Sequence, residues 1–251
     1  MNEQKRQQLN KRVGLIDELR GLSIVLMVVY HTFFDLVYIF GLNIPAFNSG
    51  FLDFLQQFFA GLFIVISGVA CRYSKNNLKR GALCFGIGMV LTLVTYFFMP
   101  GELILFGILH FMGVSMMLYG LLHKALDRLS PWLGMAAMAA LFIITYRAQS
   151  GFVLWLPLPR ALYETSYLFP FGFPQRGFFS ADYFPLLPWV FLFFAGSYLG
   201  VYVKEGKMPA FCYKTHLRPL AFVGRNTLVI YVLHQPVVYG VLYLVFSFIG
   251  K

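Results

Sequence analysis

The sequence predicts an all-α fold, a polytopic membrane helix bundle of about seven or more transmembrane helices. Of the 251 residues, 59% are hydrophobic and only 12% are charged, whereas about a quarter of the residues of a soluble domain are charged. Aromatic residues make up 19%, mostly Phe and Tyr, which is typical of lipid contact and interfacial belts. The mean hydropathy of +0.71 agrees with a chain that lies mainly in a bilayer.

Seven apolar runs are long enough to cross a bilayer, which takes roughly 17 to 25 residues. The length of the chain permits one membrane domain, so we expect residues 1–251 to form a single transmembrane domain. The first run is too long, and lacks a small-residue cleavage site, for a removable signal peptide. The predicted spans are 19–41, 51–71, 81–99, 103–122, 132–147, 184–203 and 222–249.

Basic residues set the expected orientation. The 20 Lys and Arg against 10 Asp and Glu do not form one patch, so no nucleic-acid partner is expected. They gather in the N-terminal residues 1–12 and in the loops near 72–80, 123–128 and 204–218. By the positive-inside rule these segments are cytoplasmic. The N-terminal cations are Lys5, Arg6, Lys11 and Arg12.

The longest loop, residues 148–183, is then expected on the extracytoplasmic side. Loops of this length in a compact domain are uncommon and usually functional. Its stretch Phe152–Pro157 has an alternative interpretation as a re-entrant segment or a broken span. Cys71, Cys84 and Cys212 are odd in number and scattered, so neither a disulfide framework nor a metal site is expected.

The first span carries three ionisable residues, Arg20, His31 and Asp35. Such residues inside a membrane helix usually face the bundle interior and serve a pathway or a site. Arg20 and His31 return to nearly the same helical face, about 16 Å apart along the axis. This predicts an anion clamp near the surface and a deeper general base, His31, oriented by Asp35. The alternative is a buried His–Asp hydrogen bond that only ties helices together.

Two further spans carry histidines at similar predicted depth. His110 is flanked by Gly107 and Gly113, which permit close approach of a helix or a ligand; a packing histidine is an equally weighted alternative. In the last span Tyr231 and His234 share a face with Thr227, and Gln235 precedes Pro236, which is expected to kink the helix. The three histidines are therefore predicted to converge.

Four arginines lie at the predicted inner ends of spans, where guanidinium groups can bind a polyanionic ligand. The alternative is that they are snorkelling topology anchors. They are Arg20, Arg72, Arg80 and Arg225. The small residues Gly61, Ser67 and Gly68 of the second span are expected at helix contacts.

The segment before the sixth span contains Asp182, Pro185, Pro188 and Trp189. The prolines suit a helix start, Asp182 is placed to cap that helix, and Trp189 suits an interfacial belt. Alternatively, Asp182 orients an acceptor substrate at an outward-facing opening.

Five motifs in order resemble the bacterial branch of the heparan-alpha-glucosaminide N-acetyltransferase catalytic-domain family, within the broader transmembrane acyltransferases that include acyltransferase family 3. They are Leu15-Ile-Asp17-Glu-Leu-Arg20-Gly21 with His31 and Asp35, Gly61-Leu-Phe-Ile-Val-Ile-Ser67-Gly68, Phe106-Gly-Ile-Leu-His110, Asp182-Tyr-Phe-Pro185-Leu-Leu-Pro188-Trp189 and Gly224-Arg225-Asn-Thr-Leu-Val-Ile-Tyr231-Val-Leu-His234-Gln235-Pro236.

The resemblance implies a multi-pass enzyme of the bacterial inner membrane that transfers an acetyl or other acyl group. The donor would be cytoplasmic acetyl-CoA or another acyl-CoA, and the acceptor a sugar amine or hydroxyl of a glycoconjugate on the outer side. The implied catalytic residues are His31, Asp35, His110 and His234, with Arg20, Arg72, Arg80 and Arg225 on acyl-CoA. Asp182, Trp189, Gln235 and Tyr231 are expected on the acceptor side, with membrane lipid around the chain, no metal and a possible homo-oligomer.

Two other hypotheses remain open. Chains of Asp and His inside membranes also relay protons, as in a proton-coupled transporter or channel. No inverted repeat of the kind that transporters often show is visible. The third hypothesis is a noncatalytic scaffold, which would have no cavity joining Arg20 to His31.

Overall fold

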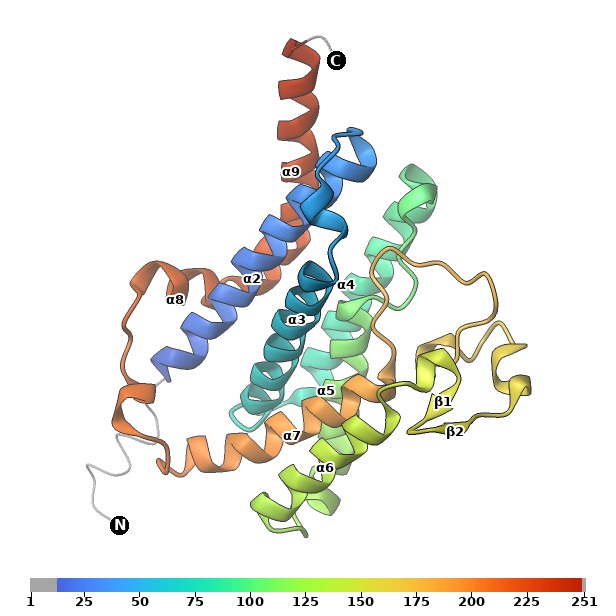
Figure 1. The fold of residues 1–251 in the computed structure, drawn as a ribbon. Helices are drawn as coiled ribbons and strands as arrows, with labels where there is room; N and C mark the ends of the chain where they lie inside the picture. The colour runs from blue at the N-terminus through green and yellow to red at the C-terminus, as the bar shows by residue number, and fades with distance from the viewer. Residues whose placement is uncertain (1–12, 250–251) are drawn as a thin grey trace. The chain divides into compact units, whose positions relative to one another are not determined.

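A computed structural model describes residues 13–249 of the chain. The predicted all-α helical bundle is confirmed, because eight α-helices form most of the described part (Figure 1). They are α2 (Gly14–Phe34), α3 (Gly50–Cys71), α4 (Asn77–Phe98), α5 (Ile108–Leu126), α6 (Pro131–Thr145), α7 (Leu186–Lys204), α8 (Arg218–Arg225) and α9 (Thr227–Ile249).

Six of the helical segments in residues 13–249 are long and apolar enough to cross a membrane. They are Gly14–Ile39, Gly50–Cys71, Asn77–Phe98, Pro131–Ser150, Leu186–Lys204 and Thr227–Phe248. Each corresponds to a predicted span. The remaining predicted span, 103–122, overlaps α5 (Ile108–Leu126), which is not among the six, so a count of seven stays a prediction. The cations Lys5, Arg6, Lys11 and Arg12 lie outside the described residues.

The chain divides into two compact units. The first consists of Met1–Ile66 and Met208–Lys251, and the second of Ser67–Lys207. We describe each unit by itself; the single transmembrane domain over residues 1–251 stays a prediction.

In the first unit α8 and α9 both pack against α2 (Figure 1). The helix α2 continues into a π-helical turn, Asp35–Ile39, so the first span is not a uniform α-helix. The last span begins at Thr227 rather than at 222, because the backbone leaves the helical conformation at Asn226 and separates α8 from α9. Pro236 lies inside α9. Short 3-10 turns occur at Pro45–Asn48 and Ala210–Tyr213.

In the second unit α4 packs on α5 and α6 packs on α7. Glycines permit these contacts: a Cβ on Gly81 would lie 2.6 Å from the carbonyl oxygen of Gly113, and a Cβ on Gly68 would meet the carbonyl oxygen of Phe193. The close approaches predicted for Gly113 and Gly68 are therefore present. All three cysteines are buried and free.

The segment from 148 to 183 consists of 3-10 turns and one small hairpin. Strand β1 (Phe152–Val153) pairs antiparallel with β2 (Leu156–Pro157). A tight hairpin rather than a helix therefore occupies Phe152–Pro157, and the alternatives of an extracytoplasmic loop and a re-entrant segment or broken span stay predictions. The 3-10 turns of this segment are Ala148–Ser150, Arg160–Tyr163 and Phe169–Phe171, and a further 3-10 turn, Pro100–Glu102, lies between α4 and α5.

Candidate functional site

The close packing of α8 on α2 builds one end of the candidate site in the first unit. A Cβ on Gly21 would meet the carbonyl oxygen of Leu220, and a Cβ on Gly224 would meet the carbonyl oxygen of Asp17. The two backbones therefore touch without intervening side chains. As a result the end of α8, with Arg225, lies beside the first turns of α2.

Two arginines share one carboxylate there. Arg20 Nη1 lies 3.9 Å from Asp17 Oδ1, and Arg225 Nε lies 3.7 Å from Asp17 Oδ2. The Asp17 side chain is 8% exposed, whereas that of Arg225 is 45% exposed. Two guanidinium groups around one carboxylate leave a net positive charge that water can reach, which suits an anionic ligand. The structure thus brings together two of the four predicted arginines.

A glutamate that the sequence analysis did not select fixes α8 in this position. Glu18 is buried, and its Oε1 accepts the backbone N–H of Leu217 at 2.8 Å and also that of His216. These donors precede the first turn of α8, so the carboxylate acts as a cap supplied by another helix. No local sequence pattern predicts a cap that comes from 199 residues away.

Farther along α2 lies a pair of imidazoles. The ring centroids of His31 and His234 are 5.1 Å apart, and Tyr231 lies 5.5 Å from His234. His234 Nδ1 is 2.6 Å from the carbonyl oxygen of Tyr231. A carbonyl only accepts, so we assign the proton of neutral His234 to Nδ1, which leaves the lone pair on Nε2. The predicted convergence is thus realised for two of the three histidines.

Asp35 does not hold His31, contrary to the prediction. The Asp35 carboxylate is fully buried, and its Oδ1 accepts a hydrogen bond of 2.7 Å from Gln235 Nε2. Asp35 begins the π-helical turn, and α9 presents the Gln235 amide to it. A buried carboxylate requires donors, and the neighbouring helix supplies one. Two atoms of this pair, Asp35 Oδ2 and Gln235 Oε1, are buried with no hydrogen-bond partner among the described residues.

His110 lies in the second unit, and both of its ring nitrogens have partners. Nδ1 accepts the backbone N–H of Gly107 at 3.2 Å, and Nε2 lies 3.2 Å from Thr92 Oγ1. The Thr92 hydroxyl itself donates to the carbonyl of Ile104, so Nε2 is the donor in its contact with Thr92. These contacts tie α4 to the first turn of α5, as in the packing alternative.

Asp182 caps a different helix from the predicted one. Its Oδ2 accepts the backbone N–H of Ile108 at 3.0 Å, at the start of α5, while the cap position of α7 is occupied by Pro185. Phe106, which precedes this helix start, adopts a left-handed conformation with a φ of 54°. The segment around Asp182 thus holds the entry to α5, a long-range contact that helix-start patterns do not reveal.

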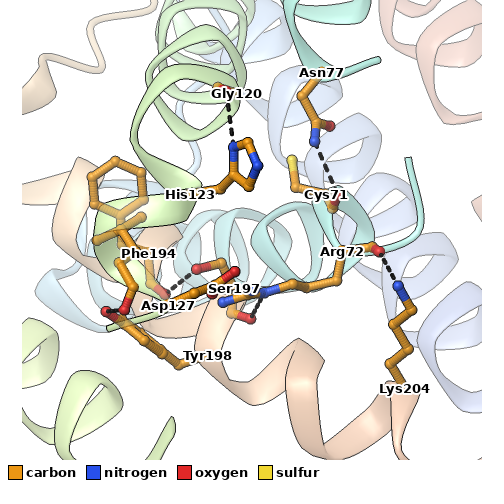
Figure 2. A network of polar contacts seen from close by, with 11 residues as sticks. Cys71, Arg72, Asn77, Gly120, His123, Asp127, Phe194, Ser197, Tyr198 and Lys204 are labelled. Atoms are coloured by element: carbon orange, nitrogen blue, oxygen red, sulfur yellow. Dashed lines mark hydrogen bonds and ion pairs between the residues drawn. The ribbon is translucent and has the colours of Figure 1, made fainter. Parts of the chain in front are cut away.

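Arg72 is the centre of a polar network in the second unit (Figure 2). Its Nε donates to the carbonyl oxygen of Ser197 at 2.8 Å, and its Nη1 lies 2.5 Å from Asp127 Oδ1. The guanidinium also lies over the rings of Tyr119 and Tyr198, and the side chain is 10% exposed. Arg72 therefore joins the end of α3 to α5 and α7. Arg80, also in this unit, is exposed on α4.

Trp189 is buried against Phe142 and Phe184. The indole lies between α6 and the start of α7, and an interfacial position for it stays a prediction. Tyr183, in the preceding segment, donates its hydroxyl to the carbonyl of Phe169, and burial raises the pKa of this phenol.

Comparison with known proteins identifies the family of the chain. The family model described as heparan-alpha-glucosaminide N-acetyltransferase, catalytic, matches residues 12–236, a range that contains every predicted site residue. No curated protein and no solved structure matches the chain. This family indicates a membrane acetyltransferase. The chain belongs to the heparan-alpha-glucosaminide N-acetyltransferase catalytic family.

Proposed function

We propose that the chain transfers an acetyl or other acyl group from cytoplasmic acyl-CoA to a sugar amine or hydroxyl on the outer side of the bacterial inner membrane. The observation that supports this most is the arrangement along α2. The Arg20–Arg225 pair lies at one end, and the His31–His234 pair lies about 16 Å farther along the axis.

The arginine pair suits the donor substrate. Coenzyme A carries several phosphate charges, and guanidinium groups bind phosphate through paired hydrogen bonds. Arg225 is well exposed at 45% of its side chain, so it can reach a ligand outside the helix pair. Among the four predicted arginines we therefore assign Arg20 and Arg225 to acyl-CoA, and we assign Arg72 to the network that joins α3, α5 and α7.

The imidazole pair suits the chemistry of transfer. In a direct transfer the acceptor N–H or O–H loses its proton to an imidazole, and the acceptor atom attacks the thioester carbonyl. The tetrahedral intermediate then expels the CoA thiolate, which takes up the proton. When the Nδ1–H of His234 donates to the carbonyl of Tyr231, Nε2 carries the basic lone pair. We therefore propose that one imidazole of the His31–His234 pair serves as base while the other stabilises the oxyanion. Asp35 has an indirect, positioning role: it accepts a hydrogen bond from Gln235, the residue after His234, and so holds this part of α9.

The test measures transfer of radiolabelled acetyl from acetyl-CoA to a carbohydrate fraction by purified protein. His31→Ala and His234→Ala should each lower kcat about 100-fold or more, the usual contribution of a general base. Arg20→Ala and Arg225→Ala should each raise the KM for acetyl-CoA about tenfold or more, since a hydrogen bond to a charged group contributes about 1.5–3 kcal/mol.

The matched control is His123→Gln, which should leave transfer unchanged. The His123 ring contacts the carbonyl of Gly120 and the ring of Tyr119, both in its own helix, and it is not one of the proposed catalytic residues. Equal transfer by the wild type and both histidine variants would contradict the proposal. Proton flux into proteoliposomes that depends on His31 and Asp35, without binding of acetyl-CoA, would instead favour the hypothesis of a proton-coupled transporter or channel.

A further inference from the structure

A groove that the proposed acyl transfer does not use lies at the end of α6. It encloses about 460 Å³ and is lined by Phe142, Ile143, Tyr146, Arg147, Leu154 and Trp155. Five of these side chains are apolar or aromatic, and the sixth is a cation. None of the described residues that line the groove is acidic.

The groove has a rigid floor because the β1–β2 hairpin is fastened to the end of α6. The backbone N–H of Phe152 donates to the carbonyl of Arg147 at 3.2 Å, and that of Leu154 donates to the carbonyl of Ile144 at 3.1 Å. Leu154 has a φ of 55°, a conformation that a non-glycine residue adopts only where its surroundings enforce it. These contacts fix Trp155 relative to α6.

The position of the groove follows from α6. The segment Pro131–Ser150 is long and apolar enough to cross a membrane, and Phe142 to Arg147 form its final turns. The hairpin attached there therefore lies at the level of the membrane surface. Trp155 is 76% exposed and Ile143 67% exposed. Tryptophan is enriched at this depth because its ring is amphipathic, and the exposed Ile143 faces the outer part of the hydrocarbon.

Arg147 supplies the charge at the rim. Its guanidinium carbon lies 5.2 Å from the centre of the Phe152 ring, a cation–π contact with the face of the ring. The N–H groups at the edge of the guanidinium can still donate to an acceptor. An apolar groove beside a cation at interfacial depth matches a phospholipid, because the groove can hold one of its acyl chains and the cation can bind its phosphate. We propose that this groove binds an anionic membrane phospholipid, its acyl chain between Ile143 and Trp155 and its phosphate on Arg147.

The experiment uses the full-length protein in detergent micelles. Phosphatidylglycerol and phosphatidylcholine carrying bromine on the acyl chain are added, and tryptophan quenching is recorded for the wild type and for Trp155→Phe. The difference between the two proteins reports Trp155, since the other tryptophans are common to both. We expect stronger quenching of Trp155 by brominated phosphatidylglycerol than by brominated phosphatidylcholine. Inorganic phosphate should not displace the lipid.

Arg147→Gln tests the headgroup contact, and Arg160→Gln is the matched control, an exposed arginine of the same segment that does not line the groove. Arg147→Gln should weaken phosphatidylglycerol binding about fivefold, the effect of one arginine near an anionic surface, and Arg160→Gln should leave it unchanged. Circular dichroism verifies that both variants remain folded.

Two results would overturn the proposal. Equal quenching by both lipids that is insensitive to Arg147→Gln would reduce the groove to general contact with the membrane. Displacement of the lipid by inorganic phosphate would identify a site for a small anion. Neither result bears on acetyl transfer, which the variants at His31 and His234 test separately.

Discussion

At the scale of single residues, Asp35 is an ionisable group of the site that is buried with few hydrogen-bond partners. It is fully buried, and its carboxylate has one hydrogen bond, from Gln235. The other carboxylate oxygen and Gln235 Oε1 are both buried acceptors with no partner among residues 13–249. A proton on Asp35 Oδ2 would turn one of these two unpartnered acceptors into a donor. We therefore predict that Asp35 is a neutral carboxylic acid that accepts a hydrogen bond from the Gln235 amide.

Substitutions of Asp35 test this description. Asp35→Asn has an N–H₂ group where the acid has its proton, so we expect a thermal midpoint within a few degrees of the wild type. Asp35→Ala removes the acceptor for Gln235 and should destabilise the protein by about 1–3 kcal/mol, the usual cost of a buried polar group left unsatisfied. The measurement is thermal unfolding of both purified variants. An Asn variant as unstable as the Ala variant would show that the charged carboxylate is required.

Unlike His31 and His234, His110 lies in the second unit, and both of its ring nitrogens contact α4 or the start of α5. In His110→Ala the buried N–H of Gly107 loses its acceptor, so the stability should fall by about 1–3 kcal/mol. Transfer by the folded fraction should stay within about threefold of the wild type. Thermal unfolding and acetyl transfer measured on the same samples separate the two effects. An unchanged thermal midpoint with abolished transfer would restore His110 as a catalytic residue.

At the scale of elements, the contact of α8 with α2 determines whether Arg225 can pair with Arg20. Gly21→Ala places a methyl group against the carbonyl of Leu220 and within 3.0 Å of the backbone nitrogen of Gly224. Backbone atoms cannot avoid the added methyl group by a change of rotamer, as side chains can, so α8 must move. We expect a loss of about 1–3 kcal/mol, as in overpacked cores, together with a higher KM for acetyl-CoA. Thermal unfolding and steady-state kinetics measure these effects.

The control for this prediction is Gly240→Ala on α9, where an added Cβ would meet nothing within 4 Å. This variant should keep the KM of the wild type, and its stability should be equal or slightly higher, because Ala favours the helix over Gly. If Gly21→Ala behaved in the same way, the close approach of α8 to α2 would have no part in binding the donor.

The elements also show what the sequence could and could not predict. Six of the predicted apolar runs correspond to candidate spans. These could be predicted because the hydropathy of a span is an average over the whole helix and does not depend on contacts with other helices. The intrahelical spacing of His31 and Asp35 suggested a dyad, but the partner of Asp35 comes from α9, 200 residues away. The cap of α5 by Asp182 and the cap of α8 by Glu18 are likewise long-range. Side-chain partners across helices depend on packing geometry, which local spacing does not contain.

At the scale of the whole molecule, α5 decides the topology. It is 19 residues long, about 28 Å at 1.5 Å per residue, close to the roughly 30 Å of a hydrocarbon core. His110, His123 and Lys124 lower its hydropathy, but the last two lie in its final turn. The basic loops at 72–80 and 123–128 lie on the same side of the membrane only if both α4 and α5 cross. The positive-inside rule therefore predicts seven crossings, with the N-terminus and C-terminus on opposite sides.

Single cysteines on the two sides of α5 test this prediction. Gly101→Cys lies before α5, where an added Cβ would meet nothing within 4 Å, and Lys124→Cys lies near its end. The buried Cys71, Cys84 and Cys212 are first replaced by Ala or Ser, and the replaced protein is checked for folding. An impermeant maleimide added to intact cells should label Gly101→Cys, whereas Lys124→Cys should react only after permeabilisation. Labelling of both from the same side would mean that α5 does not cross, and the loops 72–80 and 123–128 would then face opposite sides.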